Sequence, residues 1–157
     1  MQSFWRAVFL ALLALAASAA CANDYEVGQI WSYRARPQDP ASALMILHID
    51  KDTPRGEVIV IRIVNVNFQS ANGKMVVLEL NPPPFRPAAL DRSVIKVTGK
   101  ADKLNWNDKA YRNWKQALSE GKNVPLYDKP VAAVVSELET KMVSNMKAGA
   151  GAKKQSQ

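Results

Sequence analysis

The segment VGQIWSYRAR, residues 27–36, alternates large and polar side chains as a half-buried β-strand does. Trp31 and Tyr33 fall on one face of this strand, and Arg34 and Arg36 fall on the other. Because aromatic side chains supply much of the area of a core, we expect both rings to be buried beneath helices. The forked donors of the two arginines are then candidates for binding an acidic ligand.

An alternative role for the two arginines is structural. Asp39 follows shortly after them, and Glu57 stands at the start of a later apolar segment. A guanidinium that pairs with either carboxylate would hold the fold together and bind no ligand. The sequence leaves both interpretations open.

Three more apolar segments predict further strands. They are ALMILHI (residues 43–49), EVIVIRIVNV (57–66) and KMVVLEL (74–80), and turns rich in proline, aspartate or glycine separate them. Four closely spaced strands joined by short turns are typical of an antiparallel meander.

The second half of the chain changes to a helical period. Pro87 suits the first turn of one helix, Asn105 or Asn107 can cap a second, and Asp128 can cap a third. The apolar positions are Leu90, Val94 and Val97 in the first helix, Tyr111, Trp114 and Leu118 in the second, and Val131, Val135, Leu138 and Met142 in the third.

These patterns predict one α+β domain over residues 23–147. We expect a small curled antiparallel sheet, with an open barrel as the alternative, covered by two or three helices. Residues 148–157 have no apolar stripe to bury, and we expect them to form a disordered tail.

Residues 1–22 have the layout of a secretory signal. A weakly positive start precedes the apolar run AVFLALLALAA at residues 7–17, and small residues suited to cleavage follow. This run is too short to cross a bilayer as a helix, so we expect export to the periplasm or the medium and no transmembrane helix in the mature protein. Lipidation of Cys21 is the minority alternative, because Ser18 replaces the leucine-like residue of the lipoprotein site.

The formal net charge of the chain is +7. A basic excess between Arg92 and Lys122 can attract anionic lipid or cell-wall polymer, but we favour a solvated helix surface, because no tight run of like charges occurs. Nucleic acid is not an expected partner, because the chain has no basic-aromatic binding signature.

Residues suited to catalysis are few. His48 is the only histidine and Cys21 the only cysteine, and no metal-binding or phosphate-binding motif is present. We therefore predict no catalytic residue, metal or cofactor. The segment NPPPFRP (residues 81–87) predicts a stiff connector, with Phe85 in the core.

The first half of the chain resembles a group of small bacterial proteins with a G-x-[IV]-W-x-Y-[KR]-x-R-P opening. The matching positions are Gly28, Ile30, Trp31, Tyr33, Arg34, Arg36 and Pro37, continued by Asp39, Ser42, Leu44 and Ile46, then Phe85, Ala89, Leu90, Ser93 and Val94, and finally Tyr111 with Trp114. The resemblance implies a single fold and no particular activity. Proteins of this group often carry a histidine near the position where this chain has Asn81 and prolines, so the resemblance implies no site there.

Together these features favour an exported, non-enzymatic binding or accessory module. Its expected partner is an acidic ligand, a cell-wall polymer or a protein. One alternative is an inhibitor or immunity-type protein. A less favoured one is a small hydrolase that uses His48.

Overall fold

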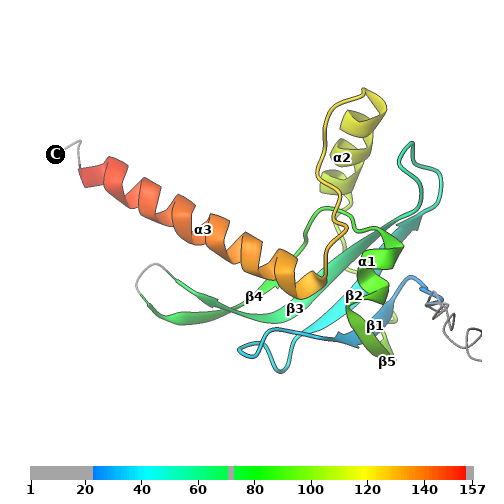
Figure 1. Cartoon of the computed structure of the whole chain (residues 1–157), viewed down its shortest axis with the longest axis horizontal. Helices are drawn as coiled ribbons and strands as arrows, with labels where there is room; N and C mark the ends of the chain where they lie inside the picture. The colour runs from blue at the N-terminus through cyan, green and yellow to red at the C-terminus, as the bar shows by residue number, and fades with distance from the viewer. Residues whose placement is uncertain (1–22, 71–72, 155–157) are drawn as a thin grey trace, which may run out of the picture.

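The computed structural model describes residues 23–70 and 73–154, and Figure 1 shows how their elements are arranged. The fold is α+β, as predicted, with one five-stranded antiparallel sheet and three helices. The strands are β1 (Gln29–Tyr33), β2 (Ala43–Asp50), β3 (Val58–Gln69), β4 (Met75–Leu80) and β5 (Val94–Lys100). The helices are α1 (Pro87–Asp91), α2 (Lys109–Ser119) and α3 (Val131–Lys154).

The strand order is β4-β3-β2-β1-β5, so the sheet is open and does not close into a barrel. Strands β1 to β4 form the expected antiparallel meander. The fifth strand was not predicted: β5 returns to pair antiparallel with β1, on the side of β1 opposite to β2.

The prediction of one helix that includes Leu90, Val94 and Val97 is wrong beyond Asp91. Pro87 does open α1, but that helix has five residues, and Val94 begins a strand. The segment VIKVT is largely β-branched, which favours strand over helix. Pairing with β1 then satisfies its backbone, a long-range partner that local spacing does not reveal.

The main core lies on one face of the sheet. Trp31 and Tyr33 are each 5% exposed and belong to this core, which confirms the prediction that they are buried. Helices α1 and α3 contribute Leu90 and Val131 to it. Phe85 is fully buried, and its backbone exchanges two 2.9 Å hydrogen bonds with that of Ile59.

A second, smaller core lies on the opposite face. Along β3, Ile59 and Ile61 belong to the main core, whereas Val58 and Val60 belong to the second one, as alternation requires. Leu47 joins them at a bulge in β2. This second core is covered by α2.

The apolar face of α2 packs against the second core. Its buried residues are Tyr111, Trp114 and Leu118, which confirms the predicted stripe. The side chain of Asn107 accepts a 3.0 Å hydrogen bond from the Lys109 N–H at the start of the helix. The two faces of the sheet therefore carry helices from different parts of the chain.

Helix α3 packs on the sheet only through its first turns. Val131 and Val135 are fully buried, whereas Met142 is 37% exposed, so the predicted stripe leaves the core before its end. The helix projects past the sheet (Figure 1) and continues to Lys154. The helix reaches Lys154, within the segment expected to be a disordered tail, although Gly149 and Gly151 are poor helix formers.

The predicted secretory signal and Cys21 lie outside the described residues. None of the helices in the described part of the chain is long and apolar enough to cross a membrane.

Replacing the tryptophan of α2 tests the second core. We expect Trp114→Ala to lower the free energy of unfolding by roughly 3–5 kcal/mol, because it deletes a large buried aromatic side chain. Urea denaturation of the mature protein measures this change. An unchanged midpoint would place Trp114 on the surface.

Candidate functional site

Arg36, one of the two predicted ligand-binding residues, is buried and fully engaged within the protein. Its side chain donates from Nε to Asp39 Oδ2 at 2.6 Å, from Nη1 to Glu139 Oε2 at 2.6 Å and from Nη2 to the carbonyl oxygen of Asn67 at 3.0 Å. The guanidinium carbon lies 5.8 Å from the ring centroid of Phe68, and the residue is 8% exposed. Arg36 therefore has the structural role that the sequence offered as the alternative, in which it pairs with Asp39.

Arg34 and Arg36 do not form a pair on the outer face of the sheet. Strand β1 ends at Tyr33, so the alternation does not continue to Arg36, which packs on Phe68 in the same core as Tyr33. Arg34 is exposed and donates from Nη1 to the carbonyl oxygen of Arg92 at 3.0 Å. The two arginines therefore have separate environments.

Several residues of the opening motif belong to one buried polar network. The hydroxyl oxygens of Tyr33 and Ser42 lie 2.8 Å apart, and Ser42 donates to the carbonyl oxygen of Val64 at 2.8 Å. Asp39 accepts from the N–H of Asn67 at 2.8 Å, in addition to its bond with Arg36. This motif therefore joins the β1–β2 connection to β3.

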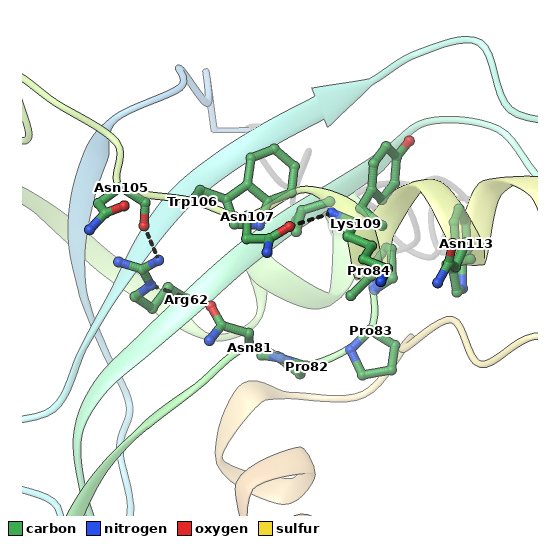
Figure 2. Close-up of a pocket in the computed structure, with 14 residues that line it drawn as sticks. Arg62, Asn81, Pro82, Pro83, Pro84, Asn105, Trp106, Asn107, Lys109 and Asn113 are labelled. Carbon is green, nitrogen blue, oxygen red and sulfur yellow. Dashed lines mark hydrogen bonds between the residues drawn. The ribbon is translucent and has the colours of Figure 1, made fainter.

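A groove of about 740 Å³ opens on the face of the sheet that α2 covers. Figure 2 shows Asn81, Pro82 and Pro83 along one bank and Trp106 and Asn107 along the other. We call it the amide groove, because four of its lining residues are asparagines: Asn81, Asn105, Asn107 and Asn113. Arg62 and Lys109 also line it, with Tyr111 and Trp114.

The first bank of the amide groove is the proline segment between β4 and α1. Pro82 and Pro84 are buried, and the following Phe85 is held to Ile59 by two backbone hydrogen bonds. Three consecutive prolines give this bank a stiff, extended backbone. The segment predicted as a connector is therefore a connector that also forms a wall of the groove.

Trp106 supplies the partly exposed aromatic surface of the groove. Tyr111 and Trp114 are buried, and Trp114 Nε1 donates to the carbonyl oxygen of Pro125 at 2.6 Å. Trp106 is half-buried, and the ring of His48 stacks on it with the centroids 5.8 Å apart. His48 also contacts the Tyr111 ring at 5.0 Å, so its role here is to support the aromatic wall.

Arg62 connects the two banks. Its Nη2 donates to the carbonyl oxygen of Asn105 at 2.7 Å, and its Nε donates to Asn81 Oδ1 at 3.3 Å. Glu79 lies 3.9 Å from Nε, but this carboxylate is 62% exposed, so the pair is weak. The guanidinium is thereby held in place at the groove.

Asp50 holds Tyr111, one of the aromatic residues that line the groove, in place. Burial opposes its ionisation, but hydrogen bonds from Lys115 Nζ at 2.5 Å, from the Tyr111 hydroxyl and from the Asp52 N–H outweigh this and lower the pKa of Asp50 to about 2. Burial and the same carboxylate raise the pKa of Tyr111. Tyr111 is therefore a neutral donor that ties α2 to the end of β2.

The amide groove was missed by sequence reasoning, which assigned Asn105 and Asn107 to helix capping and the prolines to a connector. Its available signals were the proline run and the asparagines around Trp106.

No protein-family model matches the chain, and comparisons with curated proteins and with solved structures found no similar protein. Within residues 23–70 and 73–154, no group of three or more His, Cys, Asp or Glu side chains is placed to hold a metal ion.

The burial of Arg36 has a measurable consequence. We expect Arg36→Ala to lower the free energy of unfolding by about 3–5 kcal/mol, because it leaves the carboxylate of Asp39 buried without its partner. Arg34→Ala is the matched control, since it removes an exposed cation two residues away and should change stability by less than about 0.5 kcal/mol. Equal effects of the two substitutions in chemical denaturation would contradict this assignment.

Asp50 should contribute to the acid sensitivity of the fold. Its folded-state pKa of about 2 lies below its usual value of 3.8, so the stability it provides is present above pH 4 and is lost as the pH falls toward 2. In Asp50→Asn we expect a lower free energy of unfolding at pH 7 and a smaller decline between pH 4 and pH 2. Urea titrations across this range measure both, and a decline as steep as that of the wild type would refute the assignment.

Proposed function

We propose that this protein is an exported, non-enzymatic binding module and that the amide groove is its ligand site. The observation that carries the proposal is the composition of the groove: a stiff proline wall, one partly exposed tryptophan and neutral amides on both banks. Small-molecule sites typically combine apolar walls with a few polar groups that fix orientation. The volume of about 740 Å³ lies in the usual range for such sites.

The groove also provides preorganisation, which favours binding because few groups have to be ordered when the ligand arrives. Arg62 is held by Asn81 and Asn105, the Trp106 ring is supported by His48, and the proline backbone is stiff. Export, which motivates a ligand from the cell envelope, is part of the proposal and rests on the signal-like residues 1–22.

Two alternatives remain as proposals of lower weight. A hydrolase would have to use His48, whose ring is enclosed by Trp106 and Tyr111. Turnover that His48→Ala abolishes would favour it. An inhibitor or immunity-type protein would instead act through a protein surface, and a tight complex with an envelope enzyme that groove substitutions leave intact would favour that role.

Ligand retention tests the proposal. The mature protein is incubated with the small-molecule fraction of a cell-envelope extract, and native mass spectrometry detects what stays bound. We expect a retained ligand on the wild type and its loss from Asn81→Ala/Asn113→Ala, which removes one exposed amide from each bank.

Arg34→Ala is the control for this experiment. It removes an exposed residue that is absent from the groove lining and that formed half of the predicted arginine site. We expect it to retain the ligand. If Arg34→Ala loses the ligand and the double asparagine variant keeps it, the binding site is at the end of β1 and the proposal for the groove fails.

A further inference from the structure

We propose that the ligand of the amide groove is a short saccharide that carries a carboxylate. This inference rests on the proposed function and adds the chemical class of the ligand. Three features of the lining support it: one aromatic platform, amides distributed over both banks, and an excess of positive charge.

The aromatic platform suits the face of a sugar ring. Trp106 is the one partly exposed aromatic ring among the described lining residues, since Tyr111 and Trp114 are buried. A flat indole face packs against the C–H groups of a pyranose ring. The stacked ring of His48, at a centroid distance of 5.8 Å, restrains its orientation.

The amides match hydroxyl groups that surround a ring. Each carboxamide offers both donors and an acceptor, and each hydroxyl of a saccharide also donates and accepts. Asn81 belongs to the proline bank, whereas Asn107 and Asn113 belong to the α2 bank. Polar groups on opposite banks fit a saccharide better than a nucleobase, which presents its hydrogen-bonding atoms along its edge.

The charge of the lining favours an acidic sugar. Arg62 and Lys109 line the groove, and none of the described lining residues is an aspartate or glutamate. Glu79 touches Arg62 only from an exposed position at 3.9 Å, so it neutralises the guanidinium weakly. A ligand carboxylate that lies near Arg62 or Lys109 can therefore accept charge-assisted hydrogen bonds from them.

The test compares two probes with the same sugar rings, one with free carboxylates and one with neutral methyl esters. Isothermal titration measures binding of a galacturonic-acid trisaccharide and of its methyl ester to the mature protein. A disaccharide that contains N-acetylmuramic acid serves as a second acidic sugar, and a nucleoside monophosphate as an anion without a pyranose ring. We expect both acidic sugars to bind, the methyl ester to bind more weakly, and added salt to weaken only the acidic sugars.

Variants locate the contacts. We expect Trp106→Ala to weaken the acidic probe and its ester alike, by roughly tenfold. Lys109→Gln should weaken only the acidic probe, by about threefold, because it removes an exposed charge. Asn113→Ala changes an exposed helix position, so it keeps the test valid if Trp106→Ala fails to fold, and it should weaken both probes.

The outcomes separate this inference from the proposed function. Equal affinity for the acid and its ester, or preference for the nucleotide, would overturn the acidic saccharide while leaving the groove as a binding site. An envelope ligand that the groove variants release, but with no affinity for either acidic sugar, would do the same. Acidic-sugar binding that is unchanged in Trp106→Ala and Asn113→Ala would overturn both proposals.

Discussion

Arg36 is a buried cation whose nitrogen atoms donate to its own connection and to two distant parts of the chain. Asp39 lies in the β1–β2 connection, Asn67 in β3 and Glu139 in α3. A buried charge is costly unless its partners are in place, so the fold is stable only when these elements meet. The hydrogen bonds of Tyr33 and Ser42 also link the β1–β2 connection to β3. The Arg36–Glu139 pair therefore helps to hold the long helix on the sheet, together with the buried first turns of α3.

Sequence periodicity predicted the elements whose partners are close along the chain. The meander and the burial of Trp31 and Trp114 follow from alternation and from helical spacing, which are local properties. The strand β5 was read as a helix, because its pairing with β1 joins segments about 65 residues apart. The prediction that Arg36 lies on the face opposite to Tyr33 was wrong for a related reason, since alternation holds only while the strand continues.

The candidate site was less accessible to sequence reasoning than the fold. Its banks come from three segments: Arg62 in the middle of β3, the prolines after β4, and residues 105–114, which precede and begin α2. Each segment also has an ordinary structural explanation, as strand, connector or helix cap. Only the packing of α2 on the face of the sheet that carries the second core brings these segments together. Residue spacing does not specify which face a helix covers.

That packing has a consequence for dynamics. Helix α2 rests on a small core that is separate from the main one and to which the sheet contributes Leu47, Val58 and Val60. Regions with few buried apolar contacts open more often than the global core, in cooperative units of their own. One bank of the groove thus belongs to a unit that can open while the sheet stays intact, and the Tyr111–Asp50 bond restrains that opening. Amide protons of α2 should then exchange with solvent faster than those of β3, and anything that fills the groove should slow them selectively.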